Sequence, residues 1–164
     1  MKTCNILSID FDYFQKLPDK NIISRYPDGI DLPANISCIT WAGVYTFPEE
    51  HNPIYSVAPM LPELDFVKNI IKTMPENAIN YVVNSHIHIY HMIESICRQI
   101  PDTKLHIYNL DFHHDAFYPD EELTCGNWTR YVKQNFNAKI TWVKNPLSKA
   151  ICGNIKAPSP ISII

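Results

Sequence analysis

The sequence lacks three features that would each point to a particular class of protein. No run of Lys or Arg concentrates positive charge, and the formal net charge is -3, so a nucleic-acid partner is not expected. No apolar run reaches the length that crosses a membrane. In the N-terminal segment, Asp10 and Asp12 occur before any apolar stretch is long enough to be a signal peptide. We therefore expect a cytoplasmic protein without a membrane partner.

The sequence also lacks a cysteine pattern. Its five cysteines are widely spaced, and none forms a Cys-x-x-Cys pair, so neither a disulfide framework nor a structural zinc knuckle is indicated. We expect reduced, mostly buried thiols. What is present is a chain of 164 residues of which 46% are hydrophobic, which is enough for a core of ordinary size. We expect a single domain over residues 1–164.

Apolar runs of strand length alternate with helical patterns along the chain. The strand-like runs are at residues 5–9, 36–41, 79–83, 105–110 and 140–143. Several are nearly uninterrupted, as in strands covered on both faces. Apolar residues at helical spacing occupy residues 64–74 and 89–100 and stop before prolines. The alternation predicts a three-layer α/β/α domain with a mostly parallel sheet.

Two segments rich in Pro, Asp and Asn, residues 15–35 and 43–62, interrupt this alternation. They predict long loops within one domain rather than linkers between domains. The C-terminal sequence KAPSPISII is compatible with a final edge strand or with an arm.

Metal-binding residue types follow three of the predicted strands. They are Asp10 and Asp12 after the first strand, His86 and His88 after the third, and Asp111, His113 and Asp115 after the fourth. Reactive groups gather at the carboxyl ends of strands in open parallel sheets. If residues 111–115 are extended, the two acids and His113 face one way and His114 faces the other. The sequence therefore predicts one cluster of carboxylates and imidazole.

Such a cluster needs a cation, because packed carboxylates repel and raise one another's pKa values. Carboxylate and imidazole ligands without a thiolate favour Mn²⁺ or a similar divalent ion over a structural zinc. Four carboxylates exceed what one ion requires, so we expect two ions roughly 3.5–4 Å apart that share carboxylates and a water, which would then be a hydroxide near neutral pH.

These motifs resemble the dinuclear manganese site of ureohydrolases, the arginase and agmatinase superfamily. The strand-end motifs match, and Thr124-Cys125-Gly126-Asn127 is similar to the Ser-Gly-Asn loop with which arginases contact substrate. The stretches LSIDFDYF, DFHHD and CGNW together look like a small, circularly permuted branch, the peptide arginases. The resemblance implies a shortened, permuted arginase-like fold. It also implies that the chain is a hydrolase that converts arginine side chains of a ribosomally synthesised precursor peptide to ornithine and urea.

The resemblance also implies roles for the metal ligands. Asp10 and Asp111 would bridge two Mn²⁺ ions. His86 and Asp115 would complete the ligands of one ion, and Asp12 and His113 those of the other. A hydroxide that bridges the ions would attack the guanidinium carbon, and the leaving amine would need a proton.

Two departures from the family leave other roles open. The Asp-x-Asp motif opens the chain instead of coming last, and Thr129 stands where the family loop has a histidine thought to shuttle protons. His88 and His51 are the substitutes for that proton donor.

Substrate contacts are also assigned by the resemblance. Glu49 and Glu50 are the candidates for binding the guanidinium group, with Glu49 counted among the catalytic residues. Asn127 and Cys125 are the candidates for contacting the substrate backbone.

Three other readings use the same residues. A haloacid-dehalogenase-like phosphatase would use Asp10 as nucleophile and Asp12 as general acid, with Asp111 and Asp115 on Mg²⁺, but His113 would have no role. A zinc-dependent deacetylase would leave Asp10 and Asp12 unexplained. A non-catalytic metal- and peptide-binding module would fit the missing loop histidine.

Overall fold

The computed structural model describes residues 2–16, 36, 38–39, 42–43, 46, 58–59, 61–116, 122–148 and 162–163. The chain forms two compact units, one of residues 1–13, 29–31 and 83–164 and the other of residues 14–28 and 32–82. Glu49, Glu50 and His51 lie outside the described residues, as does most of the two predicted long loops. Among the described residues, no helix is both long enough and apolar enough to span a bilayer.

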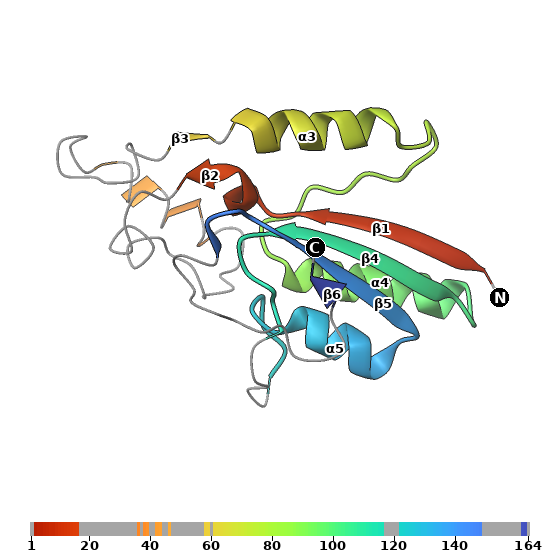
Figure 1. Ribbon diagram of the computed structural model, residues 1–164. Coiled ribbons are helices and arrows are strands. Elements are labelled where there is room, and N and C mark those ends of the chain that lie inside the picture. Colours follow the sequence, from red (N-terminus) through yellow and green to blue (C-terminus); the bar gives the residue numbers. More distant parts are fainter. Residues whose placement is uncertain are drawn as a thin grey trace. The chain divides into compact units, whose positions relative to one another are not determined.

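The first unit is built on a parallel sheet (Figure 1). Its strands, in the order β1-β4-β5-β6, are β1 (Thr3–Ile9), β4 (Lys104–Asp111), β5 (Ala138–Lys144) and the short β6 (Ser162–Ile163). All three neighbouring pairs are parallel. This confirms the predicted parallel strands at residues 5–9, 105–110 and 140–143, and it shows that the C-terminal segment adds an edge strand.

Two helices, α4 (Ile87–Gln99) and α5 (Trp128–Asn135), pack on one face of this sheet. The strands contribute every second residue to the shared core, for example Leu105 and Ile107, as the alternation of side chains across a strand requires. The helices contribute residues four apart, Ile89 with Ile93 and Trp128 with Val132. Each fully buried apolar side chain of this kind stabilises the fold by about 1.5–3 kcal/mol.

Helix α4 confirms the helical pattern predicted over residues 89–100. The backbone N–H of Ile100 donates to the carbonyl of Ile96 and closes the last turn. Pro101 cannot continue the helix, and Asp102 then adopts a positive φ of 61° that turns the chain toward β4.

The second unit contains α3 (Leu61–Lys72) and a short antiparallel pair, β2 (Gln15–Lys16) with β3 (Ala58–Pro59). A 3-10 turn, η1 (Phe11–Phe14), follows β1. The helical pattern predicted over residues 64–74 is confirmed by α3, which ends before Pro75.

Two predicted strands are wrong. In the segment 36–41, the described residues Ile36, Cys38 and Ile39 are helical, because a short apolar run fits either structure until its neighbours decide. Residues 79–83 form no strand, and the side chains of Ile79 and Val82 are exposed. The fold is α/β with a small parallel sheet, and its two-sided covering stays a prediction.

Among the described cysteines, Cys4, Cys38 and Cys97 are free thiols. They are exposed or half-buried, so the expectation of mostly buried thiols is wrong for this set.

Candidate metal centre

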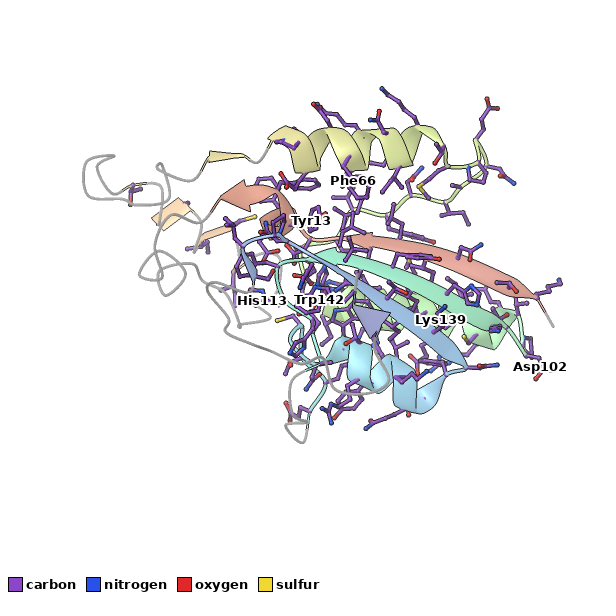
Figure 2. The ribbon with its side chains drawn as sticks, viewed as in Figure 1. Tyr13, Phe66, Asp102, His113, Lys139 and Trp142 are labelled. Carbon is purple, nitrogen blue, oxygen red and sulfur yellow. The ribbon has the colours of Figure 1, made fainter. Side chains whose placement is uncertain are left out.

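The carboxyl ends of β1 and β4 bring two acids together. Ile9 and Leu110 are partners in the parallel register, and the Asp10 N–H donates to the Leu110 carbonyl at 2.8 Å. The next residues, Asp10 and Asp111, therefore leave adjacent strand ends. Figure 2 shows Tyr13, His113 and Trp142 toward this end of the strands, and Asp102 and Lys139 toward the opposite end.

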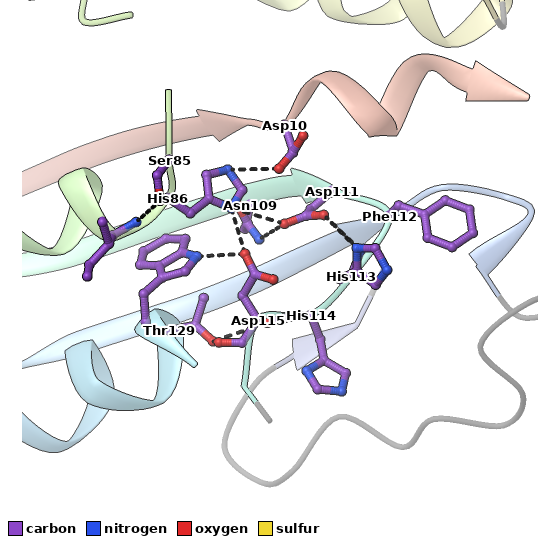
Figure 3. A network of polar contacts seen from close by, with 12 residues as sticks. Asp10, Ser85, His86, Asn109, Asp111, Phe112, His113, His114, Asp115 and Thr129 are labelled. Carbon is purple, nitrogen blue, oxygen red and sulfur yellow. Dashed lines mark hydrogen bonds and ion pairs between the residues drawn. The ribbon is translucent and has the colours of Figure 1, made fainter. Parts of the chain in front are cut away.

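One group of ligand atoms surrounds His86, which directly precedes α4. Its Nδ1 lies 2.6 Å from an oxygen of Asp115 and 3.5 Å from one of Asp111. Its Nε2 lies 3.4 Å from an oxygen of Asp10. Figure 3 shows the three carboxylates arranged around the imidazole ring. One ligand atom from each of Asp10, His86 and Asp111 falls within a 4.8 Å span, which is a spacing that can hold a metal ion.

A second group surrounds His113. Its Nδ1 lies 3.2 Å from an oxygen of Asp12 and 3.9 Å from one of Asp111. Ligand atoms of Asp12, Asp111 and His113 again fall within 4.8 Å of one another. Asp111 belongs to both groups, so the two candidate ion positions share one carboxylate. The Asp111 side chain is only 1% exposed, whereas Asp12 and His113 are 25% and 29% exposed and Asp10 of the first group is 35% exposed. The shared carboxylate is therefore buried, and each group has at least one partly exposed ligand.

Hydrogen bonds fix the shared carboxylate. Asn109 Nδ2 donates to one oxygen of Asp111 at 3.0 Å, and the backbone N–H of His113 donates to the other at 2.8 Å. The indole N–H of Trp142 donates to the Asp111 carbonyl at 3.0 Å. Asp111 is therefore oriented before any ion arrives.

The Asp-x-Asp turn is fixed in the same way. The Asp12 N–H donates to a carboxylate oxygen of Asp10 at 3.1 Å, and the Phe112 N–H donates to one of Asp12 at 3.1 Å. Asn145 Nδ2 donates to the Tyr13 carbonyl at 2.8 Å, and the Asn145 N–H donates to the Asp111 carbonyl at 3.3 Å. The loop after β5 thus ties together the loops after β1 and β4.

Sequence reasoning missed the supporting residues Asn109, Trp128, Trp142 and Asn145. The available signals were local. Asn109 lies two positions before Asp111 and therefore on the same face of β4, and an indole N–H in a buried segment needs an acceptor.

The expected extended conformation of residues 111–115 is wrong. Phe112, His113 and Asp115 lie in bends, and Asp115 has a positive φ of 49°. Strand alternation would have aligned these side chains on a single face. Instead the bent loop wraps Asp115 and His113 to different sides of Asp111, which produces two ligand groups. His114 turns away, as expected (Figure 3), and its Nδ1 accepts the Ala116 N–H at 2.9 Å.

The carboxylates of the centre carry more negative charge than its protein groups neutralise. Burial and the neighbouring carboxylates raise the pKa of Asp111 well above its ordinary value. Burial, followed by the charge of Asp12, raises the pKa of Asp10. A bound cation would relieve this repulsion.

The pKa values of His86 and Asp115 each shift in the direction that favours the charged form. Burial lowers the pKa of His86, but the hydrogen bond and charge of Asp115, together with the charge of Asp10, outweigh it and raise the value to about 9. Burial raises the pKa of Asp115, but the hydrogen bond and charge of His86 lower it overall. The charged forms of His86 and Asp115 thus stabilise each other.

The other predicted site residues lie around this centre in different ways. His88 is exposed on α4, and its Nδ1 lies 3.2 Å from the Ser85 carbonyl. The Asn127 amide is buried within its own loop, where it accepts the Thr124 N–H and donates to the Glu122 carbonyl. The Cys125 side chain is half-buried. The proton-donor and substrate-binding roles of these residues stay predictions.

The residues present suit a divalent ion. The donor set is carboxylate oxygen and imidazole nitrogen without sulfur, which is the ligand chemistry of Mn²⁺ and similar ions. Near the centre, the Ser8 hydroxyl and the Asn109 side-chain oxygen are buried and have no hydrogen-bond partner among the described residues.

Comparison with protein-family models, with curated proteins and with solved structures finds no match to this chain.

Proposed function

We propose that the chain is a manganese-dependent ureohydrolase that converts arginine side chains of a precursor peptide to ornithine with release of urea. The observation that carries the proposal is the sharing of Asp111 between two groups of candidate ligands. Two ions held by a common carboxylate are the arrangement that the resemblance to the arginase superfamily implies. We place the observed α/β unit in a shortened, permuted, three-layer version of that fold.

The ligands divide between the two ions as follows. Asp111 would serve both ions, because it belongs to both groups of candidate ligands. Asp10 lies 3.4 Å from His86 and belongs to the first group, and the resemblance implies that it would bridge to the second ion as well. His86 and His113 would each hold one ion, with Asp115 and Asp12 as their respective partners. When bound, a pair of divalent ions supplies a nucleophile from water at neutral pH and stabilises the developing charge.

The proposed reaction is the hydrolysis of the guanidinium group by one water molecule. Water oxygen adds to the guanidinium carbon, the bond from this carbon to the side-chain Nε breaks, and Nε takes up a proton to leave as the ornithine amine. The half-exposed side of the centre, at Asp12 and His113, supports approach of a side chain from a peptide rather than enclosure of a free amino acid. We assign protonation of the amine to His88 or His51, and guanidinium binding to Glu49 and Glu50.

A phosphatase using Asp10 as nucleophile is the second reading. It explains the four carboxylates, but the imidazoles of His86 and His113 among them would have no role. The non-catalytic binding module has the same metal ligands and differs only in turnover.

The test is a mass spectrum of arginine-containing peptides, and of free arginine, after incubation with protein reconstituted in Mn²⁺. Hydrolysis removes about 42 Da per arginine and forms urea, and Asp111→Asn should abolish both signals. Phosphate release from a phosphoester panel, without loss of mass from peptides, would transfer the assignment to the phosphatase. Metal binding without either reaction would favour the binding module.

A further inference from the structure

The first turn of α5 holds Asp115 at both its backbone and its side chain. We propose that Trp128 and Thr129 are positioning residues that fix Asp115 as a metal ligand, so that the ion beside His86 and Asp115 is held more tightly than the ion beside Asp12 and His113. This inference rests on the metal centre of the proposed function. It gives the CGNWT loop a role in metal binding beside the substrate contact expected from its resemblance to the arginase loop.

The backbone of Asp115 is in an unfavourable conformation that needs support. Its φ of 49° places a non-glycine residue in the left-handed region. Thr129 supplies the support, since its N–H donates to the Asp115 carbonyl at 3.1 Å and its hydroxyl oxygen lies 2.6 Å from the same carbonyl. The hydroxyl oxygen also lies 3.1 Å from the His114 carbonyl.

The side chain of Asp115 is aimed by an indole. Trp128 Nε1 donates to the carboxylate oxygen Oδ2 at 2.7 Å, and this same oxygen contacts His86 (Figure 3). An indole N–H can donate but cannot accept or ionise, so it holds the carboxylate in its ligand geometry without adding charge. Trp128 is fully buried, so surrounding side chains hold its N–H donor in place and water does not compete for it.

The same indole also restrains the imidazole. The rings of His86 and Trp128 meet edge to face, with centroids 5.6 Å apart and planes inclined by 62°. One side chain therefore contacts both residues that are specific to this ion. Outer contacts that orient ligands typically change metal affinity by about 10-fold to 100-fold.

The ligands of the other ion have a different environment. Asp12 and His113 are 25% and 29% exposed, whereas His86 and Asp115 are 10% and 8% exposed. The Asp12 carboxylate accepts a backbone N–H from Phe112, which belongs to the bent loop rather than to a helix. Preorganised, buried ligands lose less freedom when they bind, so the two ions should differ in affinity.

The experiment is a titration of the metal-free protein with Mn²⁺. Binding is monitored by calorimetry, and the concentration of free Mn²⁺ is measured by electron paramagnetic resonance. The wild-type protein should show two unequal affinities. Trp128→Phe should weaken the tighter one by about 10-fold or more and leave the weaker one unchanged. Thr129→Val should act in the same direction, and Thr129→Ser, which keeps the hydroxyl, should restore wild-type binding.

Val132→Ala is the matched control, because Val132 is buried in the same helix and core but belongs to neither ligand group. It should reduce stability without changing either affinity. Equal weakening of both ions in Trp128→Phe and Thr129→Val, no weakening in either, or a wild-type protein that binds no Mn²⁺ would overturn the inference. Selective weakening in a protein that forms no urea would retain the inference and reject the proposed reaction.

Discussion

His86 Nδ1 lies 2.6 Å from Asp115 Oδ2, although the two residues are 29 positions apart in the chain. His86 precedes α4 and Asp115 lies in the loop after β4, so the contact depends on the packing of this helix and this strand on a common core. Asp111 extends this pair toward His113 and Asp12. The folded first unit therefore brings the candidate metal ligands together without an ion.

The two imidazoles should control one ion each. His86→Ala and His113→Ala should each bind one equivalent of Mn²⁺ fewer than the wild-type protein, because each ring belongs to only one of the two ligand groups. Elemental analysis after equilibrium dialysis measures the number of ions bound. Loss of both ions in either variant would argue against separate ligand groups.

The sequence predicts those parts of this centre that depend on where parallel strands end. Asp10 and Asp111 were placed together because parallel strands end at one edge, and the register of Ile9 with Leu110 bears this out. Strand period alone predicts a single cluster, and only the resemblance to the arginase superfamily implies two groups. The left-handed backbone of Asp115 and its contact with Thr129 could not be predicted from strand alternation. The strand predicted at residues 79–83 is wrong because apolar, β-branched composition fits a strand in general. Whether such a segment joins a sheet depends on tertiary context, and here its side chains are exposed.

The metal-free protein should lose stability as the pH rises. The folded pKa of His86 is about 9, above the ordinary 6.5, so the folded state binds more protons between these values. The stabilising contribution is complete below pH 6.5, is lost as the pH rises through 9, and amounts to about 3 kcal/mol. The raised pKa values of Asp10 and Asp111 act in the same direction at lower pH.

Urea unfolding of the metal-free protein at pH 6.5 and pH 9.5 measures this effect. Saturating Mn²⁺ should reduce the difference, since the ion replaces the proton on His86. A His86→Asn variant should show a flatter dependence on pH. Stability that increases over this interval in the metal-free protein would contradict the assigned protonation.

The loop after β5 should stabilise the centre through Asn145. Asn145→Ala removes the donor to the Tyr13 carbonyl and the acceptor for the Leu147 N–H from a fully buried position. Loss of buried hydrogen bonds leaves their partners unsatisfied, and the cost should be about 1–3 kcal/mol of unfolding free energy. Chemical denaturation measures it, with Asn80→Ala as the control because Asn80 is exposed and donates to the nearby Ala78 carbonyl. Equal effects of the two substitutions would remove the structural role assigned to Asn145.

The most direct test of a two-ion centre is whether two bound ions share the Asp111 carboxylate. Equilibrium dialysis and electron paramagnetic resonance of the Mn²⁺-loaded protein measure both the number of ions and their magnetic coupling. We predict two ions per chain with the spectrum of an exchange-coupled pair, and we predict that Asp111→Asn loses the coupling and weakens the binding of both ions. A single uncoupled ion in the wild-type protein, or an Asp111→Asn variant that keeps a coupled pair, would contradict the centre described above.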